Sequence, residues 1–145
     1  EAFNEAFSYS NKTAMSLSDK FCVERHKKNF LELVQNKLDI TFANEQEITE
    51  LIDARSFDEV ISFGKNLNKT LVITRSDKGS IAIYKNEIVE CKSQKNLKII
   101  DLTGAGDLFA AGFLHCYINK MSIHDSLNKG TEMASKVIQI IGARL

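Results

Sequence analysis

The sequence predicts an α/β fold in which a mostly parallel central sheet carries helices on both of its faces. Segments whose apolar residues recur at helical spacing alternate along the chain with short apolar runs of strand length. The strand predicted at 70–74 is apolar throughout rather than alternating, which is typical of a sheet that is covered on both sides. Right-handed crossovers between such strands place helices on both faces, so we expect a layered architecture.

The size and composition of the chain fit one soluble globular domain. Its 145 residues are 43% hydrophobic and 26% charged, and a chain of this length buries roughly 70% of its unfolded surface. The formal net charge of +0 gives no support for nucleic acid or a membrane as a partner. No apolar run approaches the ~20 residues that a membrane span needs. The cysteines are odd in number and lack metal-binding spacing, so we expect free thiols in a reducing cytoplasm.

The first half of the chain alternates between helical and strand patterns. Helices are predicted at 1–11, 23–36 and 56–67, and a further helix opens at 43–47. Strands are predicted at 13–18, 39–42 and 70–74. This order of elements is the one expected for parallel strands joined by helical crossovers.

The second half begins with a hairpin and ends with helices. A polar turn at 75–79 leads into hairpin strands at 80–84 and 87–91. After a polar connection, residues 97–100 are predicted to return to the sheet as a buried strand. The apolar segment at 108–117 predicts a buried helix, and a last helix is predicted from Ser122 through Ile138.

The stretch between the predicted strand at 97–100 and the buried helix carries the chemistry. Gly104 and Gly106 lack a Cβ, so the backbone can turn tightly and approach a ligand. The first N–H groups of the following helix are then unpaired at the positive end of its dipole, which suits a phosphate. Asp107 is placed to accept a proton from a hydroxyl that attacks this phosphate. The pattern predicts phosphoryl transfer, and the alternative is a turn that only joins a strand to a helix.

The run D-L-T-G-A-G-D-L-F-A-A-G-F at 101–113 resembles the C-terminal signature of the PfkB family of carbohydrate and nucleoside kinases. The resemblance implies the ribokinase-like layered fold and implies that Asp107 is the catalytic base. The positions that match the family's anion hole for the transferred phosphate are Gly104, Ala105 and Gly106. Asp101, which we group with Thr103, matches a position that helps to hold a monovalent cation near that hole.

The N-x-x-E pattern at Asn44 and Glu47 has two interpretations. Structurally it is a capping box, in which Asn44 caps a helix and the Glu47 side chain reaches back to the cap. It also matches a PfkB motif that organises magnesium and phosphate through water. Magnesium prefers oxygen ligands and keeps several waters, so one carboxylate and one amide suit that role. We expect both interpretations to apply.

Two further segments match nucleotide-binding parts of the family. The family carries a T-x-G-x-x-G type of turn after a strand, and here Thr74 and Gly79 match it while Ser76 replaces the more usual Gly. The resemblance therefore implies that Thr74, Ser76 and Gly79 contact ATP, and a plain turn into a hairpin is the alternative. The closing residues Gly142 and Ala143 match a stretch near the adenine and the monovalent cation.

The resemblance implies transfer of the ATP γ-phosphate to a hydroxyl of a sugar or nucleoside, with ATP and Mg²⁺ as cofactors. It implies a cytoplasmic enzyme with a small-molecule partner, and it leaves K⁺ and a homodimer open. Family members are longer, so we expect residues 1–145 to be the C-terminal part of one kinase domain, without its N-terminal substrate and lid part and inactive in isolation. The alternative is a catalytically incomplete nucleotide-binding fragment. A dinucleotide-binding domain is disfavoured because the turn lacks the third glycine of G-x-G-x-x-G.

Overall fold

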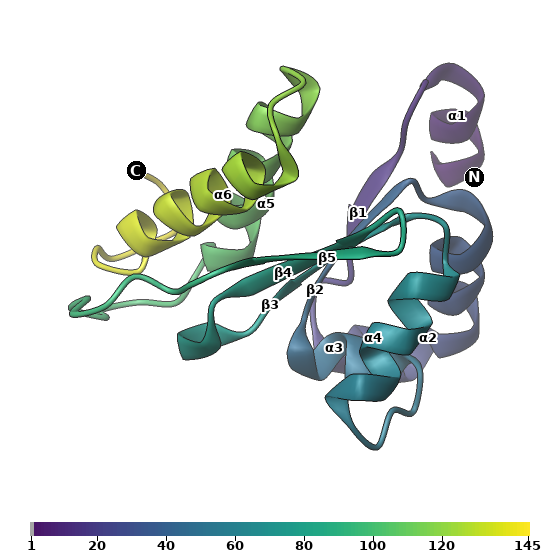
Figure 1. Cartoon of the computed structure of the whole chain (residues 1–145), viewed down its shortest axis with the longest axis horizontal. Helices are drawn as coiled ribbons and strands as arrows, with labels where there is room; N and C mark the ends of the chain where they lie inside the picture. The colour runs from purple at the N-terminus through teal and green to yellow at the C-terminus, as the bar shows by residue number, and fades with distance from the viewer. Residues whose placement is uncertain (1) are drawn as a thin grey trace. The chain divides into compact units, whose positions relative to one another are not determined.

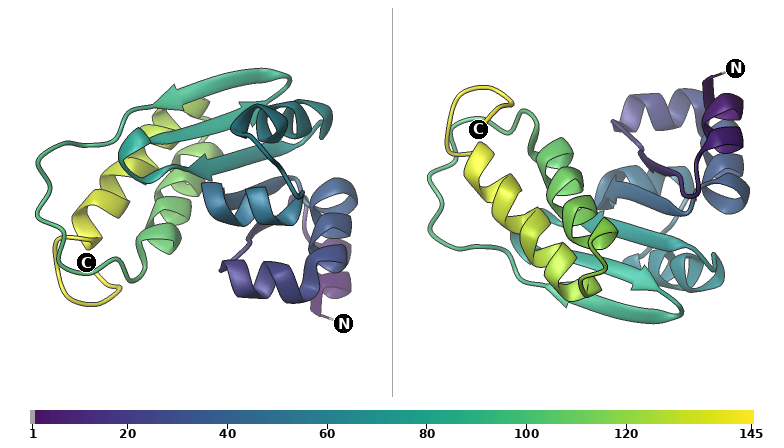
Figure 2. Two further views of the ribbon diagram at one scale, coloured as in Figure 1. Left: turned by 90° about the horizontal axis from the view of Figure 1, so that it is seen from below. Right: turned by 90° about the horizontal axis from the view of Figure 1, so that it is seen from above.

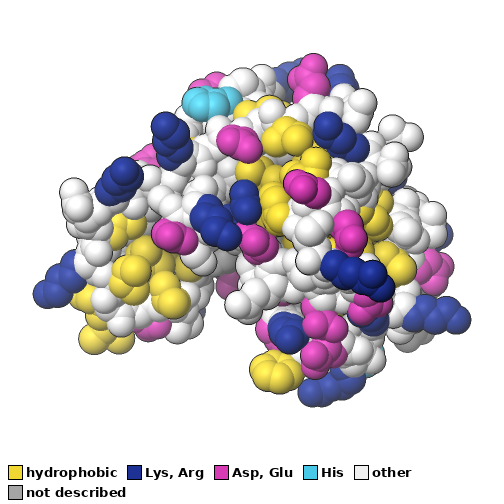
Figure 3. All heavy atoms as spheres, turned by 60° about the horizontal axis from the view of Figure 1, so that its bottom comes forward, with side chains coloured by type: hydrophobic (Ala, Val, Ile, Leu, Met, Phe, Trp, Pro, Cys, Tyr) yellow, Lys and Arg dark blue, Asp and Glu magenta, His cyan; other side chains and the backbone are white. Residues whose placement is uncertain are grey.

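A computed structural model describes residues 2–145, with the backbone alone at 2–4 and 6. The chain divides into two compact units, the first formed by residues 1–73 and 83–87 and the second by residues 74–82 and 88–145. The apolar face predicted for the first helix falls largely on side chains outside the described residues. Figure 1 labels the helices and strands along the chain. On the face drawn in Figure 3, charged side chains of both signs are interspersed, as the net charge of +0 leads one to expect.

The central sheet confirms the predicted α/β fold class. Five strands are hydrogen-bonded in the order β1-β2-β3-β4-β5, in a mixed, mostly parallel sheet. β1 and β2 pair in parallel, with Ala14 opposite Ile40 and Ser16 opposite Phe42. The strands are β1 Ala14–Ser16, β2 Ile40–Asn44, β3 Thr70–Thr74, β4 Ser80–Tyr84 and β5 Glu87–Cys91. The turn between β4 and β5 has positive φ at Lys85 and Asn86, the conformation that a two-residue hairpin requires.

The first unit holds α-helices, of which those that follow β1 connect successive strands of the sheet. They are α1 Ala2–Tyr9, α2 Lys20–Glu32, α3 Glu45–Leu51 and α4 Phe57–Asn66, and a π-helical turn, Leu33–Lys37, follows α2. Their inward side chains, among them Val23, Ile48 and Val60, are fully buried. Helix α2 begins at Lys20, three residues before the start of the helix predicted at 23–36. The reason is its N-cap: the Asp19 side chain accepts the Cys22 N–H at 2.8 Å and so caps the first turn.

The second unit is built on two helices that lie side by side, α5 Ala105–Ile118 and α6 Ile123–Val137 (Figures 1 and 2). Their backbones approach closely at two glycines. A Cβ on Gly112 would lie 2.7 Å from the carbonyl oxygen of Lys129, and one on Gly130 would lie 2.8 Å from that of Phe109. Phe109, Phe113 and Leu127 are buried around this crossing. The crossing gives the start of α5 a rigid support.

The prediction of a strand at 97–100 is wrong. The structure has no regular element between β5 and α5, and Figure 2 draws this stretch as a loop. Ile99 and Ile100 are 62% and 49% exposed. The N–H groups of Ile100 and Asp101 donate to the carbonyl of Ile138, at 2.8 and 3.3 Å. The segment is therefore anchored by the end of α6 rather than by the sheet.

Candidate active site

The glycine turn forms the start of α5. Gly104 is the N-cap residue and adopts the left-handed conformation, with φ 78° and ψ 1°. A non-glycine residue is strained in this region of backbone conformation, so Gly104 allows the chain to enter the helix directly from the loop. The carbonyl of Gly104 accepts the Leu108 N–H at 2.9 Å and closes the first helical turn.

The N–H groups at the start of α5 are only partly used. The Ala105 N–H donates to the Leu102 carbonyl at 3.2 Å. Within the described part of the chain, no hydrogen-bond partner is found for the N–H groups of Gly106 and Asp107. A Cβ built on Gly106 would meet nothing within 4 Å, so the space beside it is open. The N–H groups that remain for a ligand at this turn are thus those of Gly104, Gly106 and Asp107, whereas that of Ala105 is used by the Leu102 carbonyl.

Asp107 is exposed and lies in the first turn of α5. The positive end of the helix dipole favours an ionised carboxylate at this position. The side chain therefore shares its helix end with the open N–H groups. The first turn of α5 thus presents a carboxylate and open N–H donors beside one another.

Asp101 ties the glycine turn to the end of the chain. Its Oδ1 accepts the Thr103 N–H at 2.9 Å and the Thr103 hydroxyl at 2.7 Å. Its Oδ2 accepts the Gly142 N–H at 2.9 Å. These hydrogen bonds lower the pKa of Asp101 to about 2, those from Thr103 contributing most. The structure thereby brings together the two segments that contain Asp101, Thr103 and Gly142.

Ala143 contacts the turn as well. A Cβ on Gly104 would lie 2.7 Å from the Cβ of Ala143 and 3.0 Å from its Cα. The resemblance placed Gly142 and Ala143 near the adenine and near the monovalent cation that it also assigned to Asp101, but it did not predict the direct contact of Ala143 with Gly104. The Ile138 carbonyl, which holds the loop before the turn, was not a predicted site residue at all. A backbone acceptor at a helix end leaves no signal in residue type.

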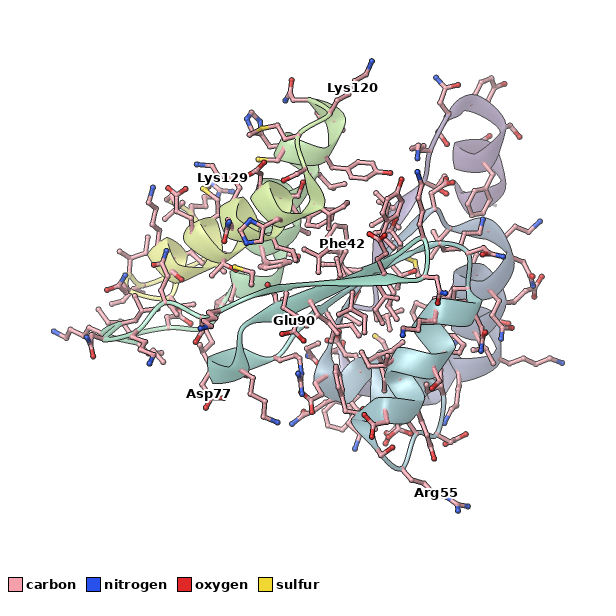
Figure 4. All side chains as sticks on the ribbon, in the orientation of Figure 1. Phe42, Arg55, Asp77, Glu90, Lys120 and Lys129 are labelled. Carbon is pink, nitrogen blue, oxygen red and sulfur yellow. The ribbon has the colours of Figure 1, made fainter. Side chains whose placement is uncertain are left out.

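The predicted nucleotide turn lies between β3 and β4, with Asp77 at its tip (Figure 4). It is a 3₁₀ turn, Ser76–Lys78, in which the Arg75 N–H donates to the Gly79 carbonyl at 2.8 Å. Gly79 has φ 91°, and a Cβ there would collide with the Cys91 carbonyl oxygen. Ser76 also has a positive φ, 53°. The position where the family carries Gly thus keeps a glycine-like backbone although a Ser occupies it.

The structure confirms the capping box at the start of α3. The Glu47 N–H donates to the Asn44 Oδ1, and the Asn44 N–H donates to the Glu47 Oε2, both at 2.8 Å. The Asn44 amide donates to the other carboxylate oxygen, also at 2.8 Å. Glu47 is 6% exposed. Burial raises the pKa of Glu47, against the lowering effect of the Asn44 N–H, and the negative charge of Asp19 raises it further.

The candidate ligands for metal ions belong to different units. Asn44 and Glu47 are in the first unit, and Asp101 and Thr103 are in the second. Among the described residues, no three His, Cys, Asp or Glu side chains converge on one point. The same residues contain no helix with the length and apolar character that crossing a membrane requires.

Comparison with known proteins gives one family. A profile described as "pfkB family carbohydrate kinase" matches residues 1–145. The adenosine kinase of Sinorhizobium meliloti superposes with a TM-score of 0.92 at 37% identity, over 99% of this chain and 44% of that structure. A probable sugar kinase from Rhizobium etli gives 0.91 at 36% identity, over 98% of this chain and 43% of that structure.

Sequence relatives include kinases of both nucleosides and sugars. The nucleoside kinase of Methanocaldococcus jannaschii is 29% identical over 118 residues, which is 81% of this chain and 38% of that relative. The chain therefore spans less than half the length of that relative and of the two solved structures it resembles.

Proposed function

Because this chain belongs to the pfkB family of carbohydrate kinases, we propose that it carries the catalytic turn of an enzyme that transfers the ATP γ-phosphate to a hydroxyl of a small sugar or nucleoside. The observation that supports the proposal most directly is the start of α5. Two N–H groups there, of Gly106 and Asp107, are without a partner among the described residues, and the exposed Asp107 carboxylate shares the same turn.

The proposed chemistry follows from these groups. Asp107 orients the acceptor hydroxyl and takes its proton as the oxygen attacks phosphorus. A carboxylate is a weak base for an alcohol, but it suffices when the transition state is loose and the proton leaves late. The N–H groups of Gly106 and Asp107 donate to the phosphoryl oxygens as negative charge develops there. One such donor contributes about 3 kcal/mol to the stability of a transition state.

ATP and Mg²⁺ complete the proposal. The nucleotide would bind at the turn that contains Thr74, Ser76 and Gly79 and at the closing residues Gly142 and Ala143. Mg²⁺ would be organised by Asn44 and Glu47. Glu47 is largely buried, and each of its carboxylate oxygens already accepts a hydrogen bond. Binding of Mg²⁺ through a bridging water therefore fits Glu47 better than direct coordination of the ion. Mg²⁺ supplies neutralisation of the phosphate charges during transfer.

A monovalent cation would be held near Asp101 and Thr103. The carboxylate of Asp101 stays ionised because its pKa is lowered to about 2, which suits a cation site. Each of its oxygens accepts hydrogen bonds in the structure, so a cation would use the remaining lone pairs. K⁺ is the ion proposed by the family resemblance.

A second candidate function is nucleotide binding without catalysis. It is favoured by the length of the chain, which spans 44% of the S. meliloti adenosine kinase. Half of a substrate pocket cannot hold two reactants in line, and alignment of the reactants supplies much of the rate in a bimolecular transfer. We therefore expect the isolated 145 residues to be inactive, and the full-length gene product to be the active species.

The test is ADP release by the full-length gene product with Mg-ATP and a panel of adenosine, fructose and ribose. We expect turnover on one acceptor, and a loss of about 10³-fold or more in Asp107→Asn with ATP affinity kept. Asp125→Asn is a matched control, because Asp125 occupies the same first-turn position in α6. Full activity in Asp107→Asn would contradict the role of this residue, and no ATP binding would contradict the proposal as a whole.

A further inference from the structure

We propose that the closing segment Ile138–Ala143 positions the glycine turn for phosphoryl transfer, and that Ala143 is the residue that sets the place of Gly104. The inference rests on the function proposed above and adds positioning residues outside the turn itself.

Helix α5 begins differently from most other helices of the chain. Four other helices are capped by a side chain that accepts an N–H of the first turn: Asp19 for α2, Asn44 for α3, Ser56 for α4 and Ser122 for α6.

Helix α5 has no side-chain cap. Its N-cap residue is Gly104, which has no side chain and more conformational freedom than any other residue. Without a side-chain cap, the first N–H groups of this helix are left to water, to a ligand or to contacts from outside the helix. The direction of the Gly106 and Asp107 N–H groups therefore depends on contacts that reach the turn from elsewhere in the unit.

The closing segment supplies those contacts at three points. The Ile138 carbonyl accepts the N–H groups of Ile100 and Asp101 and fixes the chain before the turn. The Gly142 N–H donates to the Asp101 Oδ2 at 2.9 Å. Because the Oδ1 of the same carboxylate holds Thr103 at 2.9 and 2.7 Å, one rigid group links the closing segment to the turn.

Ala143 provides the third contact, directly on Gly104. The space that a Gly104 side chain would fill is occupied by Ala143, whose Cβ and Cα lie 2.7 and 3.0 Å from the ideal Cβ position. The methyl group blocks rotation of the turn toward the closing segment. Removal of the methyl group takes away the nearest of these contacts and leaves the Cα and the carbonyl oxygen of residue 143, at 3.0 and 3.3 Å. We expect the turn to gain freedom on that side and its open N–H groups to lose part of their fixed direction.

The exposure of Ala143 makes the inference testable without unfolding the protein. Ala143 is exposed, and so is its neighbour Ile141, at 86%. Substitution at either position removes little buried apolar surface, so neither is expected to lower the melting temperature by more than about 2 °C. Of the two residues, it is Ala143 that supplies the atoms nearest to a Cβ built on Gly104. A change in catalysis confined to position 143 would thus report on the turn rather than on the fold.

The experiment uses the full-length gene product with Ala143→Gly, Ala143→Ser and the control Ile141→Ala. Misplacement of reacting groups by a fraction of an ångström costs roughly tenfold or more in rate, so we expect kcat for ADP release to fall about tenfold in Ala143→Gly. Because ATP is also proposed to bind at Ala143, the KM for ATP is measured separately. A rise in KM with kcat unchanged would reflect that contact alone and contradict the positioning role, which predicts a fall in kcat. Ala143→Ser keeps the Cβ, so its kcat should fall less than that of Ala143→Gly, and Ile141→Ala should match the wild type.

A second measurement is independent of catalysis. Amide hydrogen exchange of Thr103 and Gly142 reports the two hydrogen bonds to Asp101, and local opening raises its rate. We expect exchange at least about threefold faster in Ala143→Gly than in Ile141→Ala. If exchange is faster in Ala143→Gly but the wild type shows no kinase activity, the positioning role is supported and the proposed function is contradicted. Unchanged exchange in Ala143→Gly would overturn the positioning role, whether or not kcat fell.

Discussion

Two polar turns lead into helices of this chain, and they use their hydrogen-bonding groups in opposite ways. The capping box between β2 and α3 is closed, because Asn44 and Glu47 satisfy each other within four residues. The glycine turn before α5 leaves the N–H groups of Gly104, Gly106 and Asp107 open and takes its support from Gly142, 41 positions away from Asp101. The first turn carries its stability within itself, and the second depends on the rest of its unit.

The carboxylates of the two turns also differ, both in their burial and in the direction of their pKa shifts. Glu47 is buried, and desolvation raises its pKa. Asp101 is held by N–H and O–H donors, which lower its pKa to about 2. A polar group that closes a local box can be buried with its partners. The glycine turn, which we propose receives a phosphate, instead keeps an ionised group and open donors at the surface.

The largest effect is expected from Gly104→Ala, which breaks the open turn. The left-handed backbone costs a non-glycine residue about 1–2 kcal/mol, and the new methyl group would meet Ala143 at 2.7 Å. We expect the free energy of unfolding of the full-length protein to fall by about that amount and ADP release to fall about 100-fold. Urea denaturation and a coupled kinase assay measure the two effects.

Gly106→Ala is the matched control for stability. A Cβ at Gly106 meets nothing within 4 Å, and Ala is the better helix former by about 1 kcal/mol. Its free energy of unfolding should therefore equal or exceed that of the wild type. Adding Ala143→Gly to Gly104→Ala should recover the part of the loss that comes from the collision. An equal loss of stability in Gly104→Ala and Gly106→Ala would contradict the steric argument.

The closed turn should respond to Asn44→Ala with a loss of stability of about 1 kcal/mol. The substitution removes the acceptor of the Glu47 N–H and leaves one oxygen of a buried carboxylate without its amide donor. Ser56→Ala is a useful comparison, because the Ser56 cap of α4 has a longer hydrogen bond of 3.4 Å and is exposed. Urea denaturation should give the larger loss for Asn44→Ala, and the reverse order would contradict the closed box.

The pH dependence of stability should have opposite signs at the two carboxylates. Glu47 has a raised folded pKa, so its contribution is present below about 4.5 and is lost as the pH rises through the folded value. Asp101 has a lowered folded pKa, so its contribution is present above 3.8 and is lost as the pH falls toward about 2.

Denaturation curves between pH 2.5 and 7 compare the wild type with Glu47→Gln and Asp101→Asn. Glu47→Gln keeps a capping residue at that position and should flatten the upper part of the pH profile. Asp101→Asn should flatten the acidic part. A parallel displacement of the whole profile in either variant would contradict the assignment of that titration.

The smallest effect is expected from Ser76→Gly in the turn after β3. Glycine relieves the positive φ of Ser76, 53°, but it also increases the entropy of the unfolded chain by about 0.4–1 kcal/mol. The two terms nearly cancel, so the free energy of unfolding should change by a few tenths of a kcal/mol. A loss above 1 kcal/mol would mean that the Ser76 side chain makes a contact that the backbone argument omits.

Sequence reasoning succeeded where the decisive contacts are local. The capping box at Asn44 and Glu47, the hairpin after β3 and the cap of α6 at Ser122 each follow from residues within five positions. It failed at 97–100, where two isoleucines of strand type lie exposed in a loop. Strand propensity describes side chains that fit a sheet surface, and here the N–H of Ile100 finds its acceptor at the end of α6 instead.

The sequence by itself determined the alternation of helices and strands, the α/β class, the two turns and the residue types that occupy them. These depend on periodicity and on the conformational freedom of single residues, which are properties of short segments. The tertiary structure alone decided that Ala143 lies against Gly104, that the Gly142 N–H donates directly to Asp101, and that the Ala105 N–H is used while those of Gly104, Gly106 and Asp107 stay open. Contacts across 40 residues depend on how α5 and α6 pack, and that packing leaves no periodic trace in the chain.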